Sequence, residues 1–453
     1  MNIKEKMIDV LNLEWTSYPS RDRNVASMVC NYLRFQGLTV KEKSIFNGYY
    51  YIEKYRPKVL FMTNATGATI NFEISKYAAL KGIKVVTLVS EGNYKDDADS
   101  LDVFLWGNNY DKILYEDVCL QWSDRARKLV LSVYPELKDK EKVCGSCGAD
   151  MYKIWKGVDK QRFLNKHNKG KYKKVIGIGC WDFGPCYEGG RDYEGFLHLC
   201  GQDALERFKK DRDDFNSILK KVVEENKDIL FLVKEHPGNT DGIYMSGADG
   251  LDSCDNVLLL KFESIVDCIC VSDFWVTYES TTVFEAWMAG IQTCLINPSG
   301  LDFPRANVYL GSPNYETSEQ FQGAIDSFYE KGELLGFNDK EQDRRKLIES
   351  TVQWEDGLNH VRAGNEIIRV VNDKTKKKSQ KIPYTLRKVA FNYSLKYALR
   401  KYYPFKKSFF FADRKPFLED ELIAYSSEVM NYQKTFYKEK GLSKELLSQY
   451  KVI

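Results

Sequence analysis

At 453 residues the chain is too long for one ordinary hydrophobic core, and its length predicts two domains with an added segment. Its residues are 43% hydrophobic and 29% charged, a balance typical of soluble globular proteins. No run of about 18 apolar residues occurs, and the first residues lack the apolar core of a signal peptide. We therefore expect a cytoplasmic protein without a membrane-spanning helix.

The net charge of +3 conceals a strong asymmetry. The segment from Lys374 to Lys415 holds 14 Lys and Arg residues and one acid, Asp413, which gives a local net charge of +13. The rest of the chain carries 53 basic and 63 acidic residues, a net charge of −10. Ten aromatic residues between Tyr384 and Phe411 interleave with the basic ones. The charge of this segment indicates what kind of partner the protein binds and carries no information about its fold.

The eleven cysteines do not indicate disulfides, because their number is odd and no secretion signal accompanies them. Cys144 and Cys147 form a CxxC pair, but a zinc site needs a second pair of ligands. The pair Cys180 and Cys186 has the wrong spacing for the common zinc ribbons. We therefore expect no metal there and leave open whether the CxxC has any role.

Strand-like and helix-like segments alternate in the first half of the chain. Apolar runs predict strands at residues 37–45, 58–64, 83–92 and 101–107, with a short one at 141–147. Amphipathic patterns predict helices at residues 71–82 and 115–134. Apolar strands separated by helices indicate a parallel sheet that is covered on both faces.

The pattern restarts after a polar, basic stretch from Lys156 to Lys174, which we interpret as an inter-domain connection. Strands are predicted at residues 175–184, 229–238, 256–262, 273–278 and 291–297, with helices at 214–228, after 282 and from 340 to 373. The predicted architecture is α/β, with two Rossmann-like doubly wound domains facing a cleft. Their predicted bounds are 1–165 and 166–373, followed by a basic, aromatic, helical extension at 374–453.

Polar residues stand at four predicted strand ends, where ligands bind in open parallel sheets. The four stretches are Asn64 to Gly67, Ser90 to Gly92, Glu235 to Gly238 and Glu279 to Thr282. Two of them fall in each half, so we expect a cleft between the halves to gather all four.

Three consecutive hydroxyl residues, Ser280, Thr281 and Thr282, stand between a predicted strand and a predicted helix. Free N–H groups at the start of a helix, with hydroxyls beside them, suit a phosphate. The alternative is that one of the three merely caps the helix. Because a cap needs only one hydroxyl, we favour the phosphate.

His236 and Glu91 are the candidate catalytic residues. His236 follows a strongly apolar strand and precedes Pro237, where an imidazole can donate to a leaving phosphate oxygen. Glu91 ends the most apolar strand of the first half, where a partly desolvated carboxylate suits a general base. The alternatives are a structural histidine and an ion-paired loop glutamate.

At these residues the chain resembles the GT-B glycosyltransferases of bacterial surface-polysaccharide synthesis. "VKEHPG" resembles the His-Pro motif of sialyl-, polysialyl- and Kdo-transferases, and "YESTTVFEAWMAG" resembles their Ser-Ser/Thr motif. "VSEG" is similar to their acidic-Gly motif. "VCGSCGADMY" is similar to their segment before the linker, although its Asn, Pro and Arg are replaced here. The resemblance covers roughly residues 50 to 300 in motif order.

The resemblance implies an inverting, metal-independent transfer of a sugar from a nucleotide-activated donor to a glycan or lipid-linked acceptor. A CMP-linked acidic sugar is favoured as the donor, with UDP- and GDP-sugars as alternatives. Glu91 would be the base, His236 would support the departing phosphate, and Glu285 would hold the ribose. The remaining predicted binding residues are Asn64, Gly67, Gly92, Pro237, Glu279, Ser280, Thr281 and Thr282. No cofactor and no metal are expected.

Two alternatives remain open. A nucleotide-sugar 2-epimerase shares the two-domain architecture, but we expect further acids and a histidine in its first domain, and the first 166 residues contain no histidine. The second alternative is a non-enzymatic protein that binds nucleic acid or a membrane surface through Lys374 to Lys415. Of these partners we expect the anionic inner face of the membrane and no nucleic acid.

Overall fold

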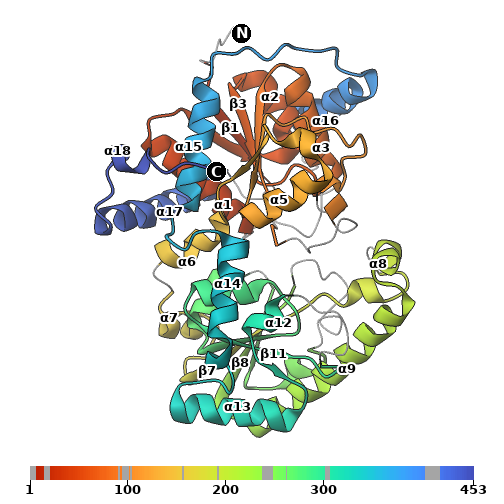
Figure 1. The fold of residues 1–453 in the computed structure, drawn as a ribbon, viewed down its shortest axis with the longest axis vertical. Coiled ribbons are helices and arrows are strands. Elements are labelled where there is room, and N and C mark those ends of the chain that lie inside the picture. The colour runs from red at the N-terminus through yellow and green to blue at the C-terminus, as the bar shows by residue number, and fades with distance from the viewer. Residues whose placement is uncertain are drawn as a thin grey trace. The chain divides into compact units, whose positions relative to one another are not determined.

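The computed structural model describes most of the chain. The described residues are 7–14, 21–89, 92–93, 101–102, 105–155, 158–190, 193–236, 248–261, 263–300, 307–402 and 419–453. Contacts divide the chain into two compact units (Figure 1): unit 1 comprises Met1–Ile154 with Ser350–Ile453, and unit 2 comprises Trp155–Glu349. The sequence prediction placed boundaries at 165/166 and 373/374, whereas residues 350–373 group here with unit 1.

Unit 1 is built on a six-stranded parallel sheet in the order β2-β1-β3-β4-β5-β6. Its strands are β1 (Val10–Glu14), β2 (Val40–Ser44), β3 (Val59–Met62), β4 (Lys84–Leu88), β5 (Val118–Gln121) and β6 (Glu141–Val143). Its helices are α1 (Arg21–Phe35), α2 (Gly48–Tyr55), α3 (Thr69–Leu80), α5 (Asp124–Val133), α6 (Met151–Ile154), α15 (Asn359–Asn372), α16 (Tyr384–Tyr402), α17 (Glu419–Glu439) and α18 (Lys444–Leu447).

Both faces of this sheet are buried, because alternate residues of each strand enter different cores. Leu11 and Leu60 pack against α2, α3 and α16, whereas Val10 and Phe61 pack against α1 and α15. Figure 1 shows these two sets of helices on opposite sides of the sheet. The C-terminal segment Ser350–Ile453 therefore completes unit 1, and α15 and α16 are part of its core.

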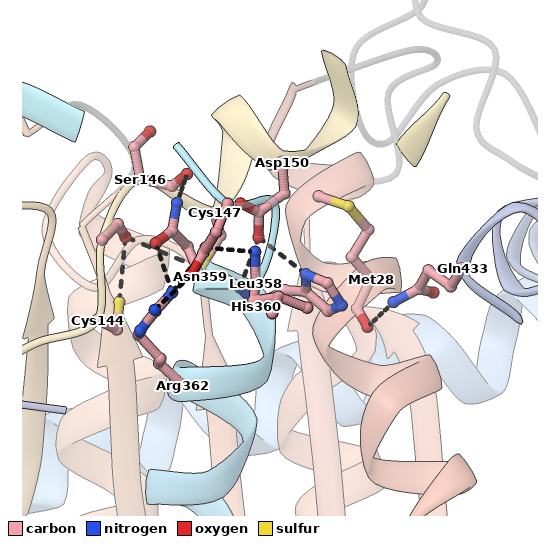
Figure 2. Close-up of polar contacts among 12 residues, drawn as sticks. Met28, Cys144, Ser146, Cys147, Asp150, Leu358, Asn359, His360, Arg362 and Gln433 are labelled. Atoms are coloured by element: carbon pink, nitrogen blue, oxygen red, sulfur yellow. Dashed lines mark hydrogen bonds and ion pairs between the residues drawn. The ribbon is translucent and has the colours of Figure 1, made fainter. Parts of the chain in front are cut away.

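A buried polar network joins the C-terminal helices to the rest of unit 1 (Figure 2). His360, on α15, donates from its backbone N–H and from Nδ1 to Asp150 Oδ2, at 2.7 and 2.8 Å. Its Nε2 lies 2.5 Å from the hydroxyl of Tyr437, on α17. On the same helix Gln433 donates to the carbonyl oxygen of Met28, in α1. His360 therefore links Asp150, which follows β6, to Tyr437 on α17.

Two elements of unit 1 differ from the sequence prediction. In the predicted strand at 101–107, the described residues 101–102 and 105–106 are helical and Gly107 lies in a turn, and Leu101 and Leu105 are buried in one apolar cluster. The predicted helix at 115–134 is the strand β5 followed by α5, whose N-cap Ser123 accepts from the N–H of Ala126. The apolar run of β5 lies fully buried between β4 and β6, and this pairing overrides the helical pattern. The strand β1 was not predicted.

Unit 2 repeats the same architecture, with a six-stranded parallel sheet in the order β12-β11-β10-β7-β8-β9. Its strands are β7 (Lys174–Gly179), β8 (Ile229–Lys234), β9 (Val257–Leu260), β10 (Phe274–Thr277), β11 (Gln292–Ile296) and β12 (Asn314–Tyr315). Its helices are α7 (Lys160–Lys166), α8 (Tyr193–Cys200), α9 (Gln202–Glu225), α10 (Ile265–Val271), α11 (Thr282–Met288), α12 (Val308–Gly311) and α13 (Ser318–Lys331), and α14 (Glu341–Val352) crosses into unit 1.

The predicted doubly wound class is confirmed for both units. In each, consecutive parallel strands are joined by helices, as the alternating sequence pattern predicts. Within the described residues, no helix combines the length and the apolar character needed to cross a bilayer. The carboxyl ends of the strands meet at one edge of each sheet, and these two edges carry the polar residues considered next.

Candidate functional site

In unit 2 the three neighbouring strands β10, β7 and β8 end side by side, because both outer strands pair with β7 in parallel register. Thr277, the last residue of β10, donates from its hydroxyl to the carbonyl oxygen of Gly179, the last residue of β7, at 2.6 Å. The chain beyond these strand ends carries Asp182, His236 and Ser280. The sheet topology therefore brings three polar side chains to one edge, as expected for a ligand site of an open parallel sheet.

His236 lies next to Asp182. Its Nδ1 is 3.6 Å from Asp182 Oδ2, an ion-pair distance when the imidazole is protonated. The side chain of His236 is 41% exposed, whereas that of Asp182 is 15% exposed. Asp182 is oriented by its other oxygen, which accepts from the N–H of Gly184 at 3.1 Å. The carboxylate therefore lies where it can pair with the imidazole when the imidazole is protonated.

The hydroxyl residues after β10 hold the turn into α11. Ser280 Oγ accepts from the N–H and from the hydroxyl of Thr282, at 3.2 and 3.1 Å. Thr282 Oγ1 in turn accepts from Trp275 Nε1 at 3.0 Å. Ser280 and Thr282 therefore hold the turn that leads into α11, whereas the N-cap residue Thr281 makes no side-chain capping bond. The assignment of these residues to phosphate binding stays a prediction.

The other predicted residues of this turn have different surroundings. Thr281 is exposed, and the side chain of Glu279, just before Ser280, is partly buried. Glu285 lies one turn into α11 and is partly exposed. Pro237 falls outside the described residues. The proposed contact of Glu285 with a ribose stays a prediction.

Lys234 is a buried cation at this edge. As the last residue of β8, it donates from Nζ to the carbonyl oxygens of Glu235 and Lys261, at 3.1 and 2.9 Å. Burial lowers the pKa of this ammonium group. Lys234 therefore ties the end of β8 to the end of β9 and stabilises the backbone that presents His236.

Unit 1 has a buried carboxyl group at the corresponding edge of its sheet. Glu14 ends β1 and is 3% exposed. Its Oε1 accepts from the N–H of Thr63 at 2.7 Å and from Asn12 Nδ2 at 3.1 Å, and its Oε2 accepts from the hydroxyl of Thr63 at 2.6 Å. Burial, together with the charge of Asp22, raises the pKa of Glu14 to about 8, although the hydrogen bonds from Thr63 and Asn12 lower it. Glu14 can therefore hold or release a proton near neutral pH.

Asn64 and Gly67 form a tight turn directly after Thr63. Asn64 Oδ1 accepts from the N–H groups of Thr66 and Gly67, at 3.0 and 2.7 Å. A Cβ atom at Gly67 would lie 2.4 Å from Asn64 Nδ2, so a side chain there would displace the amide. This geometry accounts for both residues as turn formers, and their role in binding stays a prediction.

Glu91, the predicted base, lies outside the described residues, so its role also stays a prediction. Its neighbour Gly92 is buried against Trp122, and a Cβ atom at Gly92 would lie 2.4 Å from the indole ring. Gly92 is therefore required by the close approach of a tryptophan, a reason that has no connection with a ligand.

Cys144 and Cys147 are buried, and burial holds the pKa of Cys147 well above its ordinary value. The thiol of Cys144 lies 3.3 Å from the carbonyl oxygen of Gly145 and 3.7 Å from that of Gln121. A thiol with a raised pKa, such as that of Cys147, is a poor nucleophile. In the part of the chain that the structure describes, no group of three or more His, Cys, Asp or Glu residues is placed to hold a metal ion.

No family model matches the chain, and no curated protein matches it. Solved structures do match. A Staphylococcus aureus MnaA–UDP structure has a TM-score of 0.51 at 13% identity, over 82% of this chain and 99% of the other. A UDP-N-acetylglucosamine 2-epimerase has a TM-score of 0.50 at 12% identity, over 83% of this chain and all of the other. The fold is GT-B. A Neisseria meningitidis UDP-GlcNAc 2-epimerase bound to UDP-GlcNAc has a TM-score of 0.48 at 13% identity, over 80% and 98% of the two chains.

These comparisons correct the functional prediction. The resemblance to GT-B architecture is confirmed, and the similar structures are nucleotide-sugar proteins, but the narrower likeness to sialyl- or Kdo-transferases is not supported. The prediction of a glycosyltransferase is contradicted, because the structures that match with TM-scores of 0.50 or more include UDP-N-acetylglucosamine 2-epimerases, which carry out the alternative reaction. Motif order was the basis of the wrong prediction, and one fold can carry more than one reaction.

Three residues of these edges were missed by the sequence analysis: Glu14, Asp182 and Lys234. Each had a signal, since Glu14 closes the apolar run "VLNLE" and Asp182 is the first acid after "VIGIG". Lys234 is a cation that ends an otherwise apolar strand. An ionisable residue at the carboxyl end of a buried strand is the shared pattern.

Proposed function

We propose that the protein is a nucleotide-sugar 2-epimerase that acts on a UDP-linked N-acetylamino sugar. The proposal rests chiefly on the similarity of fold over about four-fifths of the chain to structures with UDP and with this activity in their names. Polar and ionisable residues at the carboxyl edges of both sheets support it, because these edges are where GT-B-type sheets present their ligands. Sequence identity to these structures is only 13% and 12%. The choice of sugar and of nucleotide is therefore proposed together with the reaction.

Epimerisation at C2 of a sugar breaks a C–H bond and forms a new one on the opposite face of the ring. The protein must therefore supply groups that accept and return a proton at neutral pH. Glu14 has this property, because burial holds its pKa at about 8 while Thr63 keeps both carboxyl oxygens in place. We assign Glu14 the role of a proton-transferring group, in addition to the predicted Glu91. It supplies one of the first-domain acids that the sequence analysis expected of an epimerase.

His236 would bind the phosphate of the nucleotide. A protonated imidazole at a strand end donates to phosphate oxygens, and Asp182 at 3.6 Å pairs with it in that form. Ser280 and Thr281 lie beyond the neighbouring strand β10 and would add hydroxyl contacts. Lys234 acts indirectly, through the backbone it holds at the end of β8.

The decisive experiment measures hydrogen exchange at C2. The full-length protein is incubated with UDP-N-acetylglucosamine in D2O without any acceptor, and the sugar is followed by proton NMR. We expect deuterium to enter at C2 and the 2-epimer to appear. Absence of both exchange and epimer with every UDP-sugar tried would refute the proposal.

Variants test the assigned residues. We expect His236→Ala to reduce turnover about 10²-fold or more, the range typical of losing a donor that stabilises developing charge, and Asp182→Asn to have a smaller effect of the same kind. His198→Ala is the matched control, because His198 is an exposed histidine of α8 in the same unit. Equal activity of His236→Ala and His198→Ala would remove His236 from the mechanism. Circular dichroism of each variant verifies that it is folded.

A further inference from the structure

Helix α16 has one face that belongs to the core of unit 1. Leu386 and Ala390 are buried in the cluster that contains α2 and α3, and the ring of Tyr393 lies 5.7 Å from that of Tyr49. Just before the helix, the N–H of Gln380 donates to the carbonyl oxygen of Leu80. The first half of α16 is therefore anchored to the domain, and the orientation of its other face is determined.

The opposite face of α16 exposes a stripe of large apolar side chains. Tyr384 is 74% exposed, Phe391 is 64% exposed and Leu395 is 45% exposed. Their spacings of 7 and 4 residues place them on one side of an α-helix. These three side chains lie on one outward side of an anchored helix and form an apolar stripe, which Arg387 and Lys388 interrupt between Tyr384 and Phe391.

Cations surround this stripe. Arg387 and Lys388 are exposed on the same helix, and Lys376, Lys378 and Lys381 are exposed in the segment that leads into it. Within the described residues these five form no ion pair, whereas Lys377 between them is paired with Asp117. The stretch from Lys374 to Leu395 thus presents aromatic and aliphatic groups together with uncompensated positive charge.

We propose that this face of α16, with the basic segment before it, docks on the surface of an anionic lipid bilayer. Lysine and arginine near such a surface are attracted electrostatically, while aromatic and aliphatic side chains enter the headgroup region. An anionic bilayer is the expected partner because its charge is complementary to the positive charge of this face. A second copy of the same face would bring like charges together, and a nucleic acid would leave the aliphatic Leu395 without a matching group.

The inference is independent of the proposed enzymatic activity, because it uses neither His236 nor Glu14. It also specifies, in two respects, which residues of the basic segment contact the membrane. Lys377 belongs to the fold through its ion pair with Asp117, and the lipid contact is assigned to the outer face of α16.

The test is co-sedimentation of the full-length protein with vesicles of phosphatidylcholine, with or without phosphatidylglycerol. We expect binding only to the vesicles that contain phosphatidylglycerol, and release at high salt, where the Debye length falls to about 3 Å at 1 M. Binding to neither kind of vesicle, or equal binding to both, would overturn the proposal.

Two sets of substitutions separate charge from apolar contact. The charge variant replaces Lys376, Lys378 and Lys381 with Gln, and the stripe variant carries Phe391→Ser and Leu395→Ser. We expect each to weaken vesicle binding at least about tenfold, because one lysine near an anionic surface is worth about a fivefold change in affinity. All five positions are exposed, so melting temperatures should stay close to that of the unaltered protein.

Matched controls alter exposed residues elsewhere in unit 1. Lys434, Lys438 and Lys440, all on or next to α17, are replaced with Gln, and Tyr110 and Ile113 are replaced with Ser. We expect these controls to bind vesicles as the unaltered protein does. Equal losses in test and control variants would overturn the proposal, as would tighter binding to single-stranded RNA than to vesicles. A dimer in sedimentation equilibrium that the stripe variant dissociates would also overturn it, because a second copy would then occupy the face.

Discussion

Replacing Glu14 with glutamine should flatten the pH dependence of stability between pH 5 and pH 8. The ordinary pKa of a glutamate is 4.5, and burial raises that of Glu14 to about 8 in the folded protein. Between these two values the folded state binds more protons than the unfolded state, so the free energy of unfolding falls as pH rises. This loss of stability is complete at pH values above the pKa of Glu14 in the folded protein, about 8, and absent at pH values below its ordinary pKa of 4.5.

The size of the effect follows from the two pKa values. At about 1.36 kcal/mol per pH unit, the change in stability between pH 5 and pH 8 is roughly 3 to 4 kcal/mol for this one carboxyl group. A glutamine side chain at this position cannot ionise, and its carbonyl oxygen can still accept from the N–H of Thr63. We therefore expect Glu14→Gln to match the unaltered protein within about 1 kcal/mol at pH 5 and to exceed its stability by several kcal/mol at pH 8.

The assay is urea denaturation at four pH values from 5 to 8, followed by circular dichroism. Glu116 and Glu141 also have raised pKa values through burial, but both remain in the variant, so the difference between the two proteins isolates Glu14. Glu136→Gln is the control, because Glu136 is exposed. The free energy of unfolding could change with pH equally in Glu14→Gln, in Glu136→Gln and in the unaltered protein. Glu14 would then not hold a proton in the folded state between pH 5 and pH 8, contrary to our reasoning.

Two further substitutions test the packing of the two units. Tyr437→Phe removes the hydroxyl that His360 Nε2 contacts in a buried site. We therefore expect the free energy of unfolding in urea to fall by about 1–3 kcal/mol. An unchanged denaturation midpoint would contradict this hydrogen bond. Gly177→Ala places a Cβ atom 2.3 Å from the ring of Trp275 and from the hydroxyl of Ser272. We expect this overpacking to cost about 1–3 kcal/mol and to lower the melting temperature, and a stabilised variant would show that the strand can shift.

Local sequence pattern was sufficient where the local environment decides the structure. The apolar runs at β3, β4, β7 and β8 are buried on both faces, and such strands read as continuous hydrophobic stretches. The position of His236 after β8 could be predicted for the same reason, because the end of an apolar run marks the carboxyl edge of the sheet.

Pairing between strands decided what the local pattern could not. The run at β5 reads as the start of an amphipathic helix, but it lies between two parallel neighbours that bury every one of its residues. Glu14 and Thr63 are 49 positions apart, and only the pairing of β1 with β3 places them in hydrogen-bond contact. The proximity of Asp182 to His236 depends in the same way on the pairing of β7 with β8.

The sequence by itself determined the α/β class, the repetition of a doubly wound pattern and the concentration of positive charge after residue 373, because these depend on composition and periodicity. Only the tertiary structure decided that α15 and α16 enter the core of unit 1, and which face of α16 is left outside. It also decided that the raised pKa belongs to Glu14. These properties come from contacts between segments that are distant in the chain, and the burial those contacts create cannot be read from either segment alone.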